Sequence, residues 1–409
     1  MFILVMWAMF SSVFLLGAYP QDWIERLFTW FGECAANIIP QGAVQDLVVN
    51  GIISGIGSVA VFIPQILILY LFISLMEDSG YMARAAFIMD RLMHKMGLHG
   101  KSFIPMLMGF GCNVPAIMAT RTIESRSSRI ITVLITPFMS CSARLPVLIL
   151  FTGAFFPQHA ALVLMGLYLL GIVVAIITAR LLRIAKFHKD ETPFVMELPP
   201  YRWPTLRATL RHMWEKCAQY IKKIGTVILL STVVIWFLSY YPRPIEGENG
   251  KLAQMSETES EMVATMQGES IEQVAQKSTT SGINENSFIA MLGHAVEPVL
   301  APIGQNWRSG IAIITSIPAK ELVVSTLGVL YSSDSEESIT EDLRTSGDFT
   351  PRSAAAFLVF ILLFFPCIAT IAAIAHETGS KLWALFSILY NTAVAWVVAF
   401  IVYTIGGLL

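Results

Sequence analysis

The sequence predicts an all-α membrane protein that crosses the bilayer several times. Of its 409 residues, 55% are hydrophobic and only 14% are charged, and the mean hydropathy is +0.65. Several continuous apolar runs reach about 18 residues, which is long enough to span a bilayer as a helix. In one apolar segment, residues 103–150, glycines and prolines interrupt the run at two places. Interrupted helices at membrane depth are typical of transporters.

The first 76 residues predict two spans with an interfacial helix between them. Met1–Ala18 is apolar and has no basic leader region, which favours a span over a signal peptide. Pro20–Pro40 mixes aromatic and charged side chains, as helices lying at the membrane interface do. The second span covers about Ser58–Met76. The segment 1–76 is therefore expected to form one part of the molecule.

Residues 77–182 form a predicted first gate repeat, which begins with an amphipathic helix. Asp78 or Ser79 is expected to cap that helix. Glu77 and Asp78 could bind a cation at the membrane mouth, but a helix cap and a solvated face are the favoured interpretation. The sequence HGKS at 99–102 lacks the first glycine and the preceding strand of a phosphate loop, so no nucleotide is expected there.

Two breaks interrupt the apolar segment, and each lies beside a cysteine. The first surrounds Cys112 and is made by glycines and Pro115; the second runs from Pro137 to Pro146 and contains Cys141. In lipid a freed backbone group costs several kcal/mol, so a break is tolerated where it is buried in protein or lines a cavity. The two breaks therefore indicate a path or a binding site. Arg144 is expected to anchor a hairpin by donating to its free carbonyls.

The distribution of charge predicts the sides of the membrane. After a span at 160–180, the linker 183–223 holds nine basic residues. After a further span, at 224–241, the loop 242–286 holds eight Glu against three basic residues. The excess of Lys and Arg in cytoplasmic loops places the basic linker inside and the acidic loop outside.

The segment 287–409 repeats the first half and is predicted to be a second gate repeat. An amphipathic stretch is followed by a segment broken at Pro318-Ala319, which matches Pro115-Ala116, and then by an apolar span containing Cys367. Such correspondence is typical of repeat-built transporters. If 103–124 and 307–331 are re-entrant hairpins, about seven crossings remain and the hairpins enter from opposite faces, as inverted repeats require. If both cross the membrane, there are about nine crossings.

Six stretches carry a resemblance to a known family: EDSGYMARAAF, GFGCNVPAIMATRT, TPFMSCSARLPV, MELPPYR, SIPAKELVVSTLGVLY and FFPCIATIAAI. Over essentially its whole length the chain resembles the membrane part of the bacterial ferrous iron transport protein B (FeoB) family. The resemblance implies Fe²⁺ as the transported substrate. It also implies a multi-pass protein of the bacterial inner membrane, with two gate regions similar to hairpins of nucleoside-type transporters.

The resemblance also implies partners. The family normally has an N-terminal cytosolic G-protein domain, which is expected here in cis or as a separate chain, together with small Feo accessory proteins. This chain is then the transport pathway and not an enzyme, and it binds neither nucleotide nor nucleic acid. The oligomeric state stays open, a homo-oligomer included.

The predicted metal ligands are soft donors at the breaks, because Fe²⁺ accepts thiolate, thioether, imidazole and carboxylate groups. A site that must release its ion favours a few sparse ligands over a closed cage. The predicted set is Cys112, Cys141, Cys367, Met108, Met139, Asn113, Ser140 and Glu321. The alternative is packing, because free cysteine is often buried and methionine fills cores. Cys34 and Cys217 lie outside the breaks and are interpreted as incidental.

Three further ionisable groups have two interpretations each. Lys320 beside Glu321 could modulate the charge of the metal ligand, or the two could pair or reach the interface. His376 and Glu377 could take up iron at its exit, or form a solvated helix end.

Two other functions stay open: a nucleoside or small-metabolite symporter, which would need amide and carboxylate groups at the hairpin tips, and a membrane scaffold for a GTPase, which would not need thiols at matched positions.

Overall fold

A computed structural model describes residues 2–40, 43–185, 205–220, 226–241, 287–320, 322–331 and 336–407. Every regular element in these ranges is a helix, and none of the residues described forms a strand. Within the described residues, four helical stretches are long and apolar enough to cross a membrane: Arg126–Phe155, Ala160–Ala185, Pro351–Thr378 and Lys381–Ile405. The prediction of an all-helical protein with several apolar helices is confirmed.

The chain divides into two compact units. The first comprises Met1–Leu145, Met165–Val233 and Leu362–Ala395, and the second comprises Pro146–Leu164, Val234–Ile361 and Trp396–Leu409. Each predicted gate repeat therefore contributes residues to both units. The acidic loop 242–286 and much of the linker 183–223 lie outside the described residues.

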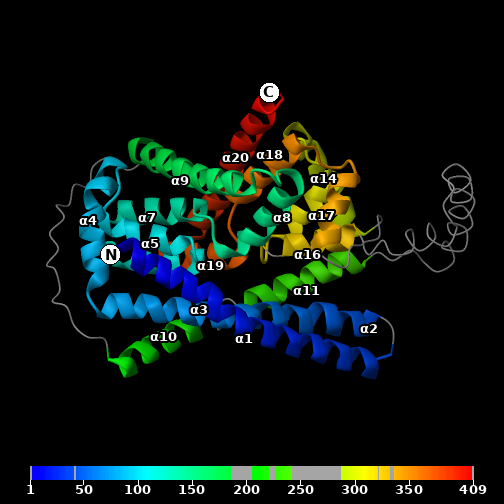
Figure 1. The fold of residues 1–409 in the computed structure, drawn as a ribbon, viewed down its shortest axis with the longest axis horizontal. Helices are drawn as coiled ribbons and strands as arrows, with labels where there is room; N and C mark the ends of the chain where they lie inside the picture. The colour runs from blue at the N-terminus through cyan, green and yellow to red at the C-terminus, as the bar shows by residue number, and fades with distance from the viewer. Residues whose placement is uncertain are drawn as a thin grey trace, which may run out of the picture. The chain divides into compact units, whose positions relative to one another are not determined.

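The first unit begins with two long helices, α1 (Phe2–Ile38) and α3 (Ser54–Asp78), which lie side by side (Figure 1). The short α2 (Ala43–Asp46) and a π-helical segment, Leu47–Ile53, connect them. The span predicted at Met1–Ala18 and the interfacial helix predicted at Pro20–Pro40 are not separate helices, because α1 runs through Pro20 without interruption. A proline removes one helical hydrogen bond, but contacts with α3 hold the helix on both sides: Gln65 Nε2 donates to Gln21 Oε1 at 2.9 Å.

The amphipathic helix predicted after α3 is present as α4 (Tyr81–Lys95), but its predicted cap is wrong. Gly80 occupies the N-cap position with a φ of 74°, and no side chain caps the helix. Only glycine adopts this conformation at little cost, so the chain turns from α3 into α4 without a capping side chain. Ser79 Oγ instead donates to the Met76 carbonyl oxygen, and Asp78 accepts a hydrogen bond from Thr209.

The first predicted hairpin consists of α5 (Phe103–Gly109) and α6 (Asn113–Ala119), which pack against each other. A 3₁₀ turn, η2 (Gly100–Ser102), precedes it and another, η3 (Thr120–Thr122), follows it. At its base Lys101 Nζ donates to Glu124 Oε1 at 2.6 Å. This hydrogen bond holds the pKa of the Glu124 carboxyl below its usual value. The two legs of the hairpin are thus tied together where they meet the rest of the chain.

Four more helices complete the first unit. They are α7 (Arg126–Ile135), most of α9 (Ala160–Ala185), α10 (Leu206–Tyr220) and α19 (Ile368–Thr378), joined by the first part of α20 (Lys381–Ile405). Thr132 of α7 donates a 2.8 Å hydrogen bond to Ser102, and Tyr390 of α20 donates one of 2.9 Å to Thr178 of α9. Helix α10 packs against α3.

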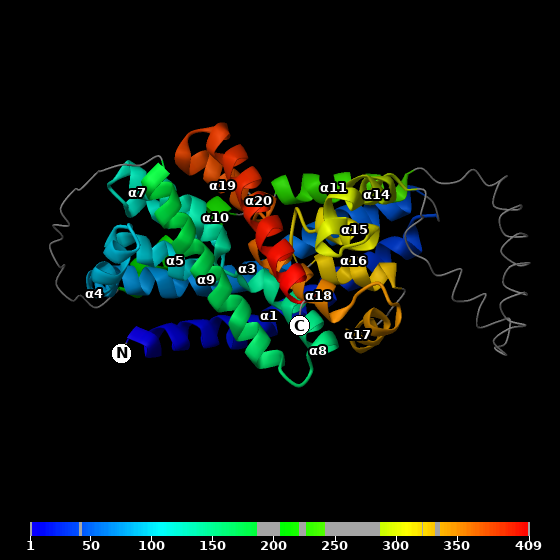
Figure 2. The same cartoon turned by 90° about the horizontal axis from the view of Figure 1, so that it is seen from above.

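The second unit is built around another helical pair. Its helices are α8 (Leu145–Phe155), α14 (Phe288–Leu300), α15 (Trp307–Thr315), α16 (Leu322–Leu330), α17 (Glu336–Thr345) and α18 (Pro351–Leu363). Helix α11 (Thr226–Tyr240) is divided, because its residues up to Val233 belong to the first unit and the rest to the second. Helix α15 packs between α14 and α16 (Figure 2). The rings of Phe151, Phe349 and Phe357 form an aromatic core, with centroids 4.8 to 5.7 Å apart.

The same order of elements occurs twice along the chain. Helix α4 precedes the pair α5–α6, the broken stretch α7–α8 and the long helix α9. In the second half α14 precedes α15–α16, the broken stretch α18–α19 and the long helix α20, with α17 added. The helices therefore follow the order that the sequence repeat predicts.

Candidate functional site

Three of the helix breaks lie in the first unit, and each contains a cysteine. The first separates α5 from α6, and its backbone is held at one point: the N–H groups of Gly111 and Cys112 both donate to the Met108 carbonyl at 3.0 Å. Cys112 itself is extended and forms the N-cap of α6. The glycines and the cysteine therefore form a tight turn at the tip of the hairpin.

The second break lies between α7 and α8 and is joined directly to the first. Here the chain passes through two 3₁₀ turns, η4 (Thr136–Phe138) and η5 (Ser142–Arg144). Ser142 donates twice to the Gly111 carbonyl oxygen, from its N–H at 3.2 Å and from Oγ at 2.9 Å. Since Cys112 follows Gly111 and Cys141 precedes Ser142, these hydrogen bonds bring the two cysteine-bearing segments together.

The third break lies between α18 and α19, and Arg144 connects it to the second. The Arg144 side chain is fully buried. Its two terminal nitrogens donate to the Pro137 carbonyl and to the Phe364 carbonyl, each at 3.0 Å. Arg144 thus donates to free carbonyls, as expected, but these carbonyls belong to the second and third breaks and not to a hairpin, and the contact with Phe364 spans 220 residues of sequence.

Cys367 forms the N-cap of α19, and its Sγ lies 3.2 Å from Thr370 Oγ1. Helix α19 packs against α6 of the first hairpin. As a result, Cys112 and Cys367 contact the same apolar cluster, which includes Tyr70, Val114 and Ala369. The cysteines at 112, 141 and 367 thus come from breaks that are joined in pairs.

The other predicted ligands in the first unit are buried beside the first two breaks. Met108, Met139, Asn113 and Ser140 are each at most 4% exposed. A Cβ placed on Gly109 would lie 2.9 Å from Met139 Cβ and 3.3 Å from Asn113 Oδ1, so this glycine lets the two breaks approach. Asn113 Oδ1 is buried and has no hydrogen-bond partner. A buried oxygen of this kind costs free energy unless a ligand or water satisfies it.

Three further charged residues singled out in the sequence are Lys320, Glu321 and Glu377. Glu321 lies outside the described residues, and Lys320 is buried in the second unit. The Glu377 carboxylate, 6% exposed, is held by both Arg121 Nε at 2.6 Å and His376 Nδ1 at 3.3 Å. Glu377 therefore joins the end of α19 to the end of the first hairpin, a pairing that no sequence pattern indicates.

Cys34 and Cys217, interpreted from the sequence as incidental, lie within helices and not in a break. Cys34 belongs to α1, and Cys217 is buried in α10, where burial raises the pKa of its thiol. A raised pKa makes a thiol a poorer metal ligand, because the thiolate is the form that binds. Ser142 was not predicted; its one sequence signal is a hydroxyl directly after Cys141 at the start of a helical turn.

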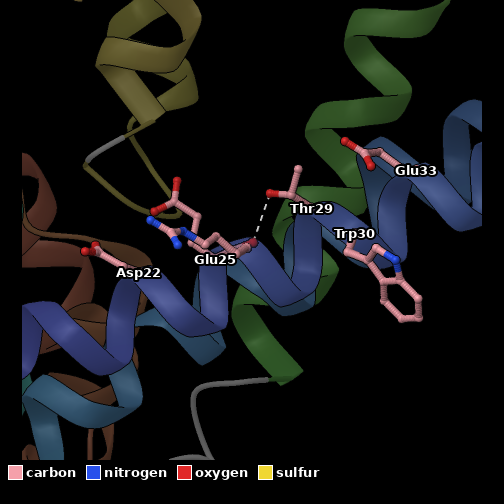
Figure 3. Close-up of a pocket in the computed structure, with 6 residues that line it drawn as sticks. Asp22, Glu25, Thr29, Trp30 and Glu33 are labelled. Atoms are coloured by element: carbon pink, nitrogen blue, oxygen red, sulfur yellow. Dashed lines mark hydrogen bonds between the residues drawn. The ribbon is translucent and has the colours of Figure 1, made fainter.

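The structure shows how the soft donors at the breaks relate to other candidate sites. Among the described residues, no group of three or more His, Cys, Asp or Glu side chains is close enough to hold a metal ion as a ready-made cage. A pocket of about 450 Å³ lies elsewhere, on α1 (Figure 3). It is lined by Asp22, Glu25, Arg26, Thr29, Trp30 and Glu33, none of which belongs to a break. The broken helices, and not this pocket, hold the soft donors.

These features define a class: a helical protein with several apolar helices of membrane-spanning length, whose broken helices meet at cysteines. Two family models match the chain. The Gate model, described as nucleoside recognition, matches residues 59–155 and 221–381, and the model for the C terminus of ferrous iron transport protein B matches residues 164–216. The chain belongs to the FeoB family, of which it represents the membrane region.

Curated relatives support this assignment over the whole chain. A Porphyromonas gingivalis protein named as a fusion of Fe(2+) transport protein A and Fe(2+) transporter FeoB is 53% identical over 99% of this chain and 50% of its own length. Proteins named Fe(2+) transporter FeoB from Methanocaldococcus jannaschii and Staphylococcus aureus are each 40% identical, over 99% and 100% of this chain and 56% and 57% of their own. The chain thus spans about half the length of these relatives. No solved structure matches it significantly.

Proposed function

We propose that this chain forms the pathway by which Fe²⁺ enters across the bacterial inner membrane, with Cys112, Cys141 and Cys367 along that pathway. The observation that carries the proposal is the pair of hydrogen bonds from Ser142 to the Gly111 carbonyl, which join two broken helices next to two thiols. The relatives' names, Fe(2+) transporter, support the choice of ion.

The donor set suits Fe²⁺ as a transported substrate. Thiolate and thioether groups bind this borderline-soft ion, and they are supplied by the cysteines together with Met108 and Met139. The unpartnered Asn113 Oδ1 adds an oxygen donor, and Ser140 a second. Because a conducting site must release its ion, ligands spread over separate breaks suit transport better than a closed cage.

The test is Fe²⁺ uptake into proteoliposomes, measured without oxygen and normalised to monodisperse protein. Replacing either Cys112 or Cys141 by serine is expected to lower uptake while leaving folding intact. The double substitution should cost less than the sum of the singles, because residues sharing one ligand are coupled. Cys34→Ser and Cys217→Ser are the controls. Normal uptake by the double variant would refute the role of the thiols.

The inverted-repeat arrangement is part of the proposal, with gate repeats at 77–182 and 287–409. The Arg121–Glu377 ion pair supports seven crossings with two hairpins. With both hairpins re-entrant, the end of the first hairpin and the end of α19 both face the cytoplasm. With nine crossings, the ends would lie on opposite faces of a hydrocarbon core about 30 Å thick, too far apart for an ion pair.

Cysteine labelling tests this topology. In a background without native cysteines, Glu124→Cys should react with a membrane-impermeant reagent from the cytoplasmic side and Thr345→Cys from the external side. Both positions are exposed, so access does not limit the reaction. Labelling of both from one side contradicts the opposed hairpins. Ser332, the natural choice beside the second hairpin, lies outside the described residues.

A nucleoside or small-metabolite symporter is the second candidate, because the Gate model is described as nucleoside recognition. The tip of the first hairpin offers one amide, Asn113, beside sulfur donors. Uptake of a labelled nucleoside that Fe²⁺ does not compete with would favour this function.

The proposed partners follow from the relatives' additional length. A G-protein domain, in cis or as a separate chain, supplies GTP hydrolysis, and small Feo accessory proteins and self-association are further proposed contacts. We place the G-domain contact on α10, within the cytoplasmic linker 183–223. Arg207 and Arg211 are exposed there, while Thr209 and Cys217 are buried.

A further inference from the structure

Arg144 has an unusual environment for a charged residue. Its side chain is fully buried, yet among the described residues no carboxylate pairs with it. Its two hydrogen bonds go to backbone carbonyls, and the third nitrogen, Nε, has no partner. Buried charges are normally paired, because removing a charge from water is costly. Donating to a carbonyl does not by itself require a positive charge, since a neutral amide also donates to a carbonyl, although more weakly than a guanidinium does.

The charge lies beside the proposed path. The Arg144 N–H donates to the Cys141 carbonyl at 3.1 Å, and its guanidinium donates to Phe364, which stands just before Cys367 in the third break. The guanidinium is held in place by the same two breaks that carry these cysteines, through Pro137 and Phe364. A guanidinium does not lose its proton in proteins. A fixed positive charge therefore stands close to two of the three thiols.

We propose that Arg144 is a positioning residue that fixes the Cys141 and Cys367 breaks together and whose charge keeps the binding of a divalent cation at these thiols weak. This inference rests on the proposed function. A transport site must release its ion as well as bind it, and thiolate ligands alone would hold Fe²⁺ strongly. The repulsion between the guanidinium and the ion offsets part of that attraction, so that the ion leaves.

The experiment separates charge from anchoring by comparing Arg144→Gln with Arg144→Lys. Equilibrium Fe²⁺ binding to the purified full chain in detergent and uptake into proteoliposomes are both measured without oxygen. Arg144→Gln is expected to lower the Kd for Fe²⁺ at least about tenfold, as the loss of a repulsion inside a low-dielectric site predicts. The same variant should lower the maximal uptake rate, because release becomes slower. Arg144→Lys, which keeps the charge, should leave the Kd within about threefold of wild type.

If Arg144 were only a structural anchor, the Kd for Fe²⁺ would rise and not fall in Arg144→Gln. Losing it would disorder the breaks, so both variants would bind Fe²⁺ more weakly and transport it more slowly. That result overturns the proposal. Arg180→Gln is the matched control: Arg180 also donates to a backbone carbonyl, that of Lys95, but it is exposed and away from the breaks. Its removal should change neither quantity.

The same measurements distinguish a failure of the Arg144 proposal from a failure of the proposed function. If the wild-type chain binds no Fe²⁺ at the thiols, judged by comparison with the Cys112→Ser/Cys141→Ser variant, the proposed function fails. If the wild type binds Fe²⁺ and Arg144→Gln does not bind it more tightly, only the role of the charge fails. If Arg144→Gln does not purify as monodisperse protein, Arg144→Lys provides the test. A Kd for Fe²⁺ raised tenfold or more in Arg144→Lys refutes the proposal that the charge of Arg144 sets the affinity, and an unchanged Kd supports it.

Discussion

Ser142 supplies the contact on which the candidate site depends, and its hydroxyl can be removed with little other change. Ser142→Ala deletes the 2.9 Å hydrogen bond from Oγ to the Gly111 carbonyl but keeps the 3.2 Å bond from the N–H. A typical hydrogen bond contributes about 1 kcal/mol net to stability. The junction between the first two breaks is then expected to open about fivefold more often, since about 1 kcal/mol corresponds to that factor.

Hydrogen exchange measures this opening directly, because amide protection reports the free energy of local unfolding. In the Ser142→Ala chain, held in lipid nanodiscs, peptides covering 106–118 and 136–147 should both exchange about fivefold faster. Fe²⁺ uptake should fall, because the two cysteine-bearing segments are less often together. Faster exchange and lower uptake are therefore expected together in the Ser142→Ala variant.

Two matched variants test the reasoning. Ser142→Thr keeps a hydroxyl and should exchange like wild type. Thr122→Ala also deletes a hydroxyl-to-carbonyl hydrogen bond, the 2.9 Å bond to Ala119, but this bond lies within one leg of the hairpin. It should leave exchange at 136–147 unchanged. If Ser142→Ala exchanges like wild type in both peptides, the hydroxyl does not hold the breaks together and the argument from it fails.

Three further predictions follow from other contacts. Glu377→Gln should speed hydrogen exchange at the end of the first hairpin, at a cost of at most about 1 kcal/mol because its arginine partner is half exposed. Gly171→Ala should lower stability by about 1–3 kcal/mol and should also lower uptake, because the added Cβ would lie 2.7 Å from a backbone oxygen of η4. Gly166→Ala is the control: the space around Gly166 is open, so this variant should match wild type in stability and in uptake. Reversing the charges of Arg207 and Arg211 should weaken co-purification with the G domain most at low salt, since salt screens exposed charges; unchanged co-purification at low salt would place the contact elsewhere.

Local chain chemistry explains which parts of this fold the sequence predicts. The break at Cys112 follows from glycines before it and Pro115 after it, and the break near Cys141 follows from Pro137, because such residues disfavour a continuous helix. The structure has breaks at both places. Proline is not decisive alone, however. Pro20 lies inside α1, where packing against α3 outweighs the loss of one hydrogen bond.

The hydrogen bonds and the ion pair that connect the broken segments could not be predicted, because they join residues far apart in the sequence. The Ser142–Gly111 contact crosses 31 residues, the Arg144–Phe364 contact 220, and the Arg121–Glu377 pair 256. Neither periodicity nor spacing encodes such pairings. The sequence does indicate that such contacts must exist, because the polar groups of a buried arginine or a broken helix need hydrogen-bond partners.

The division of the broken helices between the two units explains why the cysteines from both halves of the sequence come together. A helix needs about 20 residues to span the hydrocarbon core, but α8 has 11 residues and α18 has 13. Neither piece is therefore long enough to span on its own, and the pieces pack separately: α7 and α19 belong to the first unit, and α8 and α18 belong almost entirely to the second. In the first unit α19 packs beside the first hairpin and brings Cys367 with it. Because Ser142 and Arg144 donate to carbonyls left free by these breaks, the groups that satisfy the backbone also fix the thiols. A movement of the first hairpin would then alter the surroundings of cysteines from both halves at once, which is the coupling that a gate requires.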